Sequence, residues 1–162
     1  MNKYLEFEIS PQFDFALPFS GGLARIVQAG LWGYINREGD IVIPPRYASA
    51  RDFHEGLAEV EMERLWGYID TEGRTVIQPS FRRTGEFVEG IAAASPRGHP
   101  DGFYGFINRH GEYAIFPQFG GVGRFRHRRC FVELVDEVAY IDPEGSVTWR
   151  GPYVDVGQIS EL

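Results

Sequence analysis

The chain contains 162 residues, including 20 Gly, 13 Phe, 8 Tyr and 3 Trp, and its net charge is −7. An average protein of this length holds roughly 11 Gly, so glycine is nearly doubled, but the many aromatic residues exclude a disordered chain and the irregular glycine spacing excludes collagen. The acidic balance argues against a general nucleic-acid binder, because such proteins need a broad basic surface to displace phosphate counterions.

The first eight residues carry acidic side chains where a secretory signal peptide needs an apolar core. No stretch reaches the roughly 18 apolar residues of a membrane-spanning helix. The single cysteine, Cys130, can form neither an intramolecular disulfide nor a cysteine cluster for zinc. We therefore expect a cytoplasmic protein that has no metal or other cofactor and does not bind a membrane.

A nine-residue segment recurs along the chain. Leu31–Gly39 (LWGYINREG) returns at Leu65–Gly73 and Phe103–Gly111, with a weaker copy at Glu137–Gly145, and its final glycine recurs at spacings of 34, 38 and 34 residues. Such self-similarity indicates an array of tandem units. The sequence predicts one repeat domain over 1–162, with a partial unit at 1–22 and units at about 23–55, 56–89, 90–127 and 128–162.

Each unit is predicted to be a three-stranded antiparallel meander. In the second unit, residue types alternate over 57–63, a second strand starts near Trp66, and a β-branched run follows at 75–77. An Asn or Asp with Gly three residues later marks the turn between the second and third strands. A proline follows each third strand (Pro45, Pro79, Pro117) and is expected to end it. The units are expected to stack in a curved all-β array, either open like a solenoid or closed like a small propeller.

The combined pattern is Trp-Gly-Tyr-Ile-(Asp/Asn)-x-x-Gly, Val-Ile-x-Pro-x-(Phe/Tyr) and Phe-x-Glu-Gly-(Leu/Ile)-Ala. It resembles the WG-repeat family of bacterial proteins from about Pro11 to Tyr153. The resemblance weakens in the last unit, where Val138 and Ala139 replace Trp-Gly, as is common for a terminal repeat. It implies a role in interactions rather than a shared chemistry.

Residues that are repeated in every unit are interpreted as scaffold. Trp32, Trp66 and Tyr104 are expected in the core or between units. The glycine after each of them is expected to let an aromatic ring of a neighbouring unit come close. Function is therefore sought at positions that differ between units.

Three unit-specific features are candidates for binding a partner. Alternating glutamates in the second unit would meet a basic partner or protect an exposed edge from aggregation. A loop lengthened by four residues in the third unit would lie on the binding face or be a tolerated insertion. An arginine run and the acidic stretch after it would pair with carboxylates or with a partner, and gripping of phosphates is the less favoured alternative. The candidate partner-binding residues are Glu59, Glu61, Glu63, Arg97, His99, Asp101, Arg126, Arg128, Arg129, Asp136 and Glu137.

No catalytic or metal-binding constellation is found in the sequence, because the four histidines have neither a paired nucleophile nor metal-ligand spacing. Cys130 replaces a repeated alanine and is interpreted as a small buried thiol. We therefore predict a non-catalytic protein-binding module. Its acidic face would cover a basic site of the partner, as in an inhibitor or an immunity protein against a toxin. The alternative is a small-ligand or glycan binder with exposed aromatic rings; neither hypothesis involves nucleic acid.

Overall fold

A computed structural model describes residues 13–98 and 102–152 of the chain. Within these residues every regular element is a β-strand, and the strands form three antiparallel sheets in the orders β1-β2-β3-β4, β11-β10-β9-β8-β7-β6-β5 and β12-β13-β14-β15. The expected all-β fold of tandem repeats is confirmed. The strands are β1 (Phe15–Ser20), β2 (Leu23–Gln28), β3 (Leu31–Ile35), β4 (Ile41–Tyr47), β5 (Ser49–Ala50), β6 (Leu57–Met62), β7 (Leu65–Asp70), β8 (Thr75–Thr84), β9 (Ala92–Pro96), β10 (Tyr104–Ile107), β11 (Tyr113–Phe119), β12 (Gly121–Val122), β13 (Cys130–Glu133), β14 (Glu137–Ile141) and β15 (Val147–Pro152).

Each unit has the three expected strands and a leading segment beside the first of them, which is β1 in the first unit and a shorter stretch in the others. In the second unit, β6, β7 and β8 pair in sequence as an antiparallel meander. The leading strand follows directly from the previous unit: β5 pairs with β6, the end of β8 with β9, and β12 with β13. Consecutive units are therefore joined by backbone hydrogen bonds as well as by side-chain packing.

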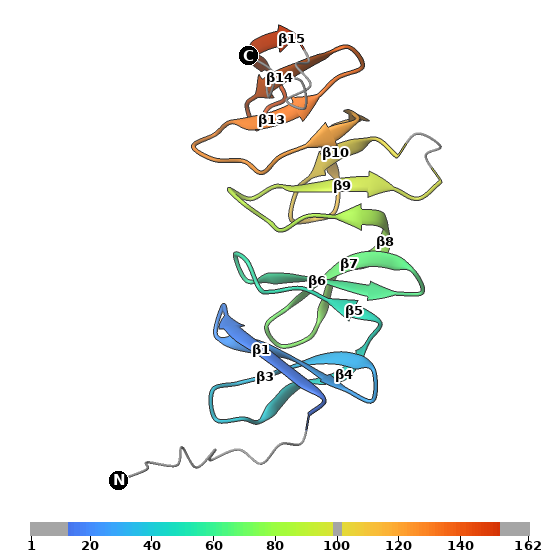
Figure 1. Ribbon diagram of the computed structural model, residues 1–162, viewed down its shortest axis with the longest axis vertical. Coiled ribbons are helices and arrows are strands. Elements are labelled where there is room, and N and C mark those ends of the chain that lie inside the picture. Colours follow the sequence, from blue (N-terminus) through green and yellow to red (C-terminus); the bar gives the residue numbers. More distant parts are fainter. Residues whose placement is uncertain (1–12, 99–101, 153–162) are drawn as a thin grey trace, which may run out of the picture.

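The units stack into an elongated array whose two ends lie far apart (Figure 1). The first unit, with β1 at its edge, forms one end, and the fourth unit, with β15, forms the other. Among the described residues no strand pairing joins these ends. Of the two arrangements that the sequence left undecided, the open array is the one observed.

Most of the core lies between consecutive units, and a smaller cluster of Ala24, Ile26 and Ile35 lies in the first unit. One cluster joins Tyr34 and Tyr47 of the first unit to Val60 and Ile69 of the second, and two similar clusters follow along the array. In each, a ring from the second strand meets, at a steep angle, a phenylalanine that follows the third strand. The ring centroids are 4.9, 4.8 and 5.1 Å apart in Tyr34–Phe53, Tyr68–Phe87 and Phe106–Phe125. Edge-to-face pairs of this kind stabilise the unit boundaries.

The glycine of each Trp-Gly pair packs against the backbone of the third strand. A Cβ atom at Gly33 would lie 2.5 Å from the carbonyl oxygen of Ile43 and 2.7 Å from the nitrogen of Pro45, and the equivalent glycines meet the same obstacle. The pairing register shifts at this point, as it does at a β-bulge. The expectation of a ring from a neighbouring unit is wrong, because the close neighbour is the irregular backbone of the same unit.

The prolines lie inside the third strands and do not end them. Pro45 is in β4, Pro79 in β8 and Pro117 in β11, each where the register shifts. Proline is tolerated at such a position because the ladder hydrogen bond is already interrupted there. The prediction that these prolines terminate the strands is therefore wrong.

The turns between the second and third strands have the predicted chemistry. The Oδ1 atom of Asp70 accepts hydrogen bonds from the backbone nitrogens of Glu72 at 3.0 Å and Arg74 at 2.9 Å. The turns at Asn108 and Asp142 repeat this arrangement. These Asn and Asp residues are turn initiators and belong to the scaffold.

A row of glutamates connects the turns that precede the first strands. The carboxylate of Glu55 accepts hydrogen bonds from the backbone nitrogens of Glu89 at 2.7 Å and Gly90 at 3.1 Å. The carboxylate of Glu89 then accepts one from the backbone nitrogen of Arg128 at 3.0 Å. The repeated Glu-Gly step thus attaches each unit to the next, and its glutamate is structural.

Candidate binding groove

A groove of about 880 Å³ runs across the first strands of consecutive units. We call it the inter-unit groove. Its charged lining consists of four arginines and three carboxyls, with one histidine: Arg25, Arg51, Arg83, Arg124, Asp52, Glu59, Glu86 and His54. A hollow of this volume is within the range of sites that bind ligands or peptide segments.

The groove is built from equivalent positions of successive units. Arg25, Glu59 and Ala93 each follow the small residue of a first strand, and each lies opposite the ring of the neighbouring strand: Tyr34, Tyr68 and Phe106. A second set, Asp52, Glu86 and Arg124, directly precedes the core phenylalanines Phe53, Phe87 and Phe125. The backbone of the lining is therefore repeated, whereas its side chains change from unit to unit.

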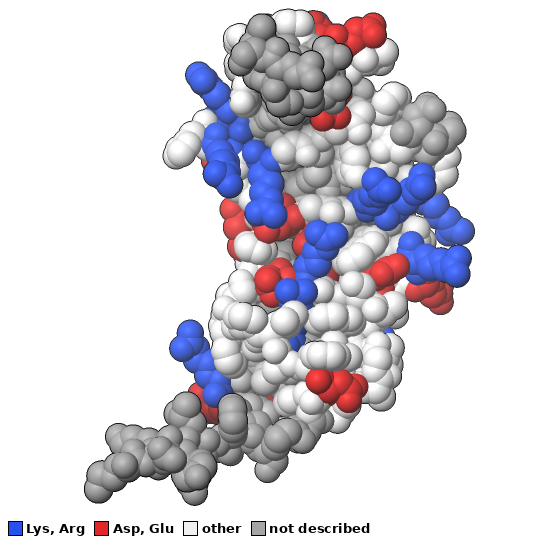
Figure 2. Space-filling model, viewed as in Figure 1, with Lys and Arg blue, Asp and Glu red and all other residues white. Residues whose placement is uncertain are grey.

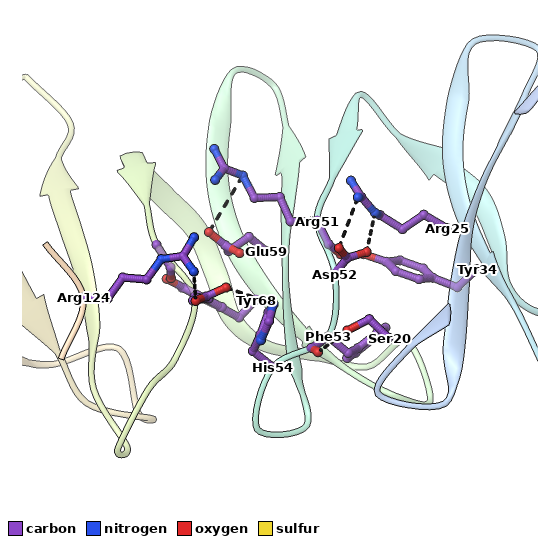
Figure 3. A network of polar contacts seen from close by, with 12 residues as sticks. Ser20, Arg25, Tyr34, Arg51, Asp52, Phe53, His54, Glu59, Tyr68 and Arg124 are labelled. Carbon is purple, nitrogen blue, oxygen red and sulfur yellow. Dashed lines mark hydrogen bonds and ion pairs between the residues drawn. The ribbon is translucent and has the colours of Figure 1, made fainter. Parts of the chain in front are cut away.

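At the N-terminal end of the groove, Arg25 is held by an ion pair. Its Nε lies 2.7 Å from Oδ1 of Asp52 and its Nη2 lies 3.3 Å from Oδ2, while Nη1 donates to the carbonyl of Ala50 at 2.9 Å (Figure 3). The guanidinium also lies 5.4 Å from the ring centre of Trp32. This bidentate geometry fixes both side chains in place.

In the middle of the groove, Glu86 contacts both a histidine and an arginine. Its carboxylate lies 2.9 Å from Nε2 of His54 and 2.6 Å from Nη1 of Arg124. These three residues come from three successive unit boundaries, so the contact spans the array. Arg124 remains 66% exposed and presents its other donors to the groove.

Between these two ion-pair clusters lies Glu59, which is only 2% exposed. Among the described residues, its Oε1 atom has no hydrogen-bond partner, and the nearest cation, Nε of Arg51, is 3.9 Å away (Figure 3). Burial raises the pKa of the Glu59 carboxyl from 4.5 to about 7, and the positive charge of Arg51 offsets only part of this effect. Arg51 itself is 56% exposed and lies 5.1 Å from the ring centre of Trp66.

Two further groups complete the polar lining. Arg83 donates from Nη1 to the hydroxyl of Tyr104 at 3.1 Å and forms no ion pair within the described part of the chain. The hydroxyl of Thr84 is buried beside Tyr68. Both residues come from the end of β8, where this strand passes to the next unit.

The local charge of a surface can differ in sign from the net charge of the chain. On the face shown in Figure 2, basic side chains gather over much of the upper half, with acidic side chains between them. In the inter-unit groove the arginines outnumber the carboxyls. A chain of net charge −7 therefore presents a locally cationic groove.

The glutamate ladder predicted for the second unit is not an exposed face. Glu59 is buried, Glu61 is half-buried, and Glu63 lies in the turn after β6 with a φ of 51°. The prediction failed because stacking of the neighbouring units covers both sides of β6. Only Glu61 and Glu63 remain accessible to a partner.

Of the other acidic and loop candidates, Arg97 and Asp136 lie between a first and a second strand, and Glu137 begins β14. Arg97 is exposed, whereas His99 and Asp101 fall outside the described residues. Asp136 is exposed, and Glu137 forms an ion pair with Arg150 at 2.5 Å. Their role in partner binding stays a prediction.

The three candidate arginines of the basic run, Arg126, Arg128 and Arg129, lie in the turn that precedes β13. Arg128 is tied to the scaffold through Glu89 and through a 2.7 Å ion pair with Glu144. Arg126 and Arg129 are exposed and line a smaller hollow of about 650 Å³. Because Glu63 follows a first strand and this run precedes one, the structure places these predicted residues on opposite edges of the array and does not bring them together.

Sequence reasoning missed most of the groove. Of its charged lining only Glu59 was among the candidates, and Arg25, Arg51, Asp52, Arg83, Glu86 and Arg124 were not. An alignment of the repeats would have indicated part of it. One position of the first strand is Arg25, Glu59 and Ala93 in successive units, while the neighbouring positions barely change. The ion pairs themselves depend on contacts between units and have no sequence signature.

The described residues contain no cluster of three or more potential metal ligands of the His, Cys, Asp or Glu type. In the same part of the chain, no helix is long and apolar enough to cross a membrane.

Comparisons with known proteins agree with the repeat architecture. The family model described as WG containing repeat matches residues 6–32, 32–65, 66–95 and 104–132. The crystal structure of BamB from Moraxella catarrhalis superposes with a TM-score of 0.50 at 15% identity, over 85% of this chain and 49% of BamB. The chain thus spans about half the length of that protein, and the likeness concerns the fold alone. A comparison with curated proteins finds no match.

Proposed function

The chain belongs to the WG-repeat family, and we propose that it is a non-catalytic protein-binding module that holds a segment of its partner in the inter-unit groove. One observation carries this proposal: the lining residues occupy equivalent positions of successive units but differ in chemistry, from Arg25 to Glu59 to Ala93. Repeat proteins commonly bind partners through such variable positions on a regular scaffold.

The groove is suited to binding rather than to chemistry. Two ion pairs, Arg25 with Asp52 and Arg124 with Glu86, give the groove a fixed pattern of charge. Fixed charges contribute orientation and specificity to a complex.

Site-specific photo-crosslinking tests the proposal. A photo-reactive residue replaces Val88, which lines the groove, and in a matched protein it replaces Val76, an exposed β8 residue outside the groove. In cells of the natural source, the Val88 protein should capture a discrete partner and the Val76 protein should not. The purified partner should also lose affinity for Ala93→Arg, which fills the groove. Equal capture at both positions, or binding unaffected by Ala93→Arg, would show that the groove is not the binding surface.

A more specific form of the proposal is an inhibitor, such as an immunity protein, that covers a basic site of its partner. The support for it is the net charge of −7 and the accessible Glu61 and Glu63. Charge reversal of these two glutamates should then weaken the complex and reduce its salt dependence. Unchanged binding by the Glu61→Lys, Glu63→Lys protein would exclude an acidic contact surface here.

A glycan-binding role is the second candidate, and an aromatic row in the fourth unit favours it. Phe131, Tyr140 and Trp149 lie on adjacent strands with ring centroids 5.9 Å apart at each step. Tyr140 is 42% and Trp149 is 51% exposed. Glycans that stack on this row should change the fluorescence of Trp149, and the Trp149→Phe protein should lose that change. A flat titration with a panel of oligosaccharides would remove this candidate.

A further inference from the structure

The centre of the inter-unit groove contains an unsatisfied buried carboxyl. Glu59 is only 2% exposed, and its Oε1 accepts no hydrogen bond from any residue that the structure describes. A buried polar atom without a partner is energetically unfavourable, so it persists where something else compensates. A bound ligand that supplies the missing hydrogen bond would be such a compensation.

The charges around Glu59 define what that ligand can be. Arg51 from the preceding segment, and Arg124 together with Glu86 from the following units, lie close enough to influence the carboxyl, as Arg25 also does. In Figure 3, Glu59 lies between Arg51 and Arg124. Both arginines are more than half exposed, so each retains donors for a ligand.

A negatively charged ligand fits this surrounding better than a positive one. A cation would have to approach between Arg51 and Arg124, where like charges oppose it. An anionic oxygen would instead receive charge-assisted hydrogen bonds from the two guanidinium groups. The protonated form of Glu59 would then donate a hydrogen bond to the same oxygen and so satisfy its own carboxyl.

We propose that the centre of the groove, formed by Arg51, Glu59 and Arg124, binds a carboxylate side chain of an extended acidic segment of the partner protein. This inference rests on the proposed function and specifies the chemistry of the partner. Arg83, which has no ion pair in the described part of the chain, extends the cationic lining for further acidic residues of the same segment.

Binding should be linked to proton uptake at Glu59. With a pKa of about 7, the carboxyl is half ionised at neutral pH, and its negative charge then competes with the ligand for Arg51. Protonation removes this competition. If only the protonated form binds, affinity should fall roughly thirtyfold between pH 6 and pH 8.5. The other titratable groups that face this site are His54, Asp52, Glu86 and Tyr68.

Fluorescence anisotropy with synthetic peptides tests the inference on the full chain. The probe is a fluorescein-labelled ten-residue Gly/Ser peptide with three alternating glutamates, compared with otherwise identical glutamine and lysine peptides and with oligouridylate. The glutamate peptide should bind at least tenfold more tightly than the other three probes. Comparable binding of the glutamine peptide, or preference for the lysine peptide or the oligonucleotide, would overturn the inference.

Three variants locate the binding to this site. Arg51→Gln should weaken glutamate-peptide binding about tenfold, a typical effect for one charge-assisted hydrogen bond. Arg82→Gln is the matched control, because Arg82 is also an exposed arginine, in β8, but does not line the groove. Glu59→Gln should bind at pH 8.5 more tightly than the natural chain and lose most of the pH dependence, whereas His54→Gln should retain it. Equal losses in Arg51→Gln and Arg82→Gln, or an unchanged pH profile in Glu59→Gln, would refute the assignment.

The two proposals fail in different ways. Capture of a partner at Val88 without binding of the glutamate peptide would leave the groove as a binding surface and refute the acidic ligand. Failure of both experiments would refute the groove itself.

Discussion

The buried Glu59 predicts an unusual pH dependence of stability. Because the pKa of its carboxyl is raised from 4.5 to about 7 in the folded chain, the folded state binds this proton more tightly than the unfolded state does. Below pH 4.5 both states are protonated and the group has no effect. As the pH rises from 4.5 to 7, the unfolded state ionises while the folded state keeps the proton, so the folded state is progressively destabilised relative to the unfolded one; above pH 7 both states ionise and the loss stays constant. At 1.36 kcal/mol for each pKa unit, the full effect is about 3 kcal/mol.

The Glu59→Gln variant isolates this contribution, because glutamine keeps the size of the side chain and cannot ionise. Urea denaturation followed by circular dichroism should show that the variant and the natural chain differ by about 3 kcal/mol more at pH 8 than at pH 4.5, in favour of the variant. Other carboxyls titrate equally in both proteins and cancel in the difference. A stability difference that does not change with pH would refute the idea that Glu59 is ionised at a desolvation cost.

Three further predictions concern the scaffold. Gly67→Ala should lower the free energy of unfolding by at least about 2 kcal/mol in chemical denaturation, because its Cβ would overlap the carbonyl oxygen of Ile77. Tyr34→Phe should cost about 1 kcal/mol in the same assay, because the hydroxyl donates a 2.7 Å hydrogen bond to the carbonyl of Arg51. Cys130 is buried, and burial raises the pKa of its thiol to about 12, so a thiol reagent such as Ellman's reagent should react at neutral pH only after denaturant is added. Rapid labelling of the folded chain would contradict this burial.

The repeat made most of the fold predictable, because each unit carries its own local signals. The turn at Asp70 followed from an Asx residue and a glycine at fixed spacing, and the buried thiol of Cys130 followed from the alanine it replaces. The leading strands, such as β5 and β12, have only two residues each and were not predicted. They form by pairing with the next unit, so their own residues carry no alternation that could indicate a strand.

The groove was much less predictable, because its properties arise where units meet. Alternation along β6 correctly separated Glu59 from Ala58 and Val60, but it could not show that both sides of this strand are covered. The same limit applies to Arg124, which belongs to a basic run in the sequence and to an ion pair with Glu86 in the structure. Periodicity assigns a residue to a face, and only the stacking of units decides what that face contacts.

The fourth unit shows how the repeated scaffold shapes the groove. In the first three units, glycine after the aromatic residue allows the third strand to shift its register beside a proline, and the chain then crosses to the next unit. The fourth unit has Ala139 at this position, and β14 pairs with β15 without a register shift from Glu137 to Tyr140. The pairing between the second and third strands is therefore regular where this position is alanine and interrupted where it is glycine. Because Asp52, Glu86 and Arg124 all lie in the segments that follow an interrupted third strand, the Trp-Gly glycine positions the variable charges of the groove without contacting it.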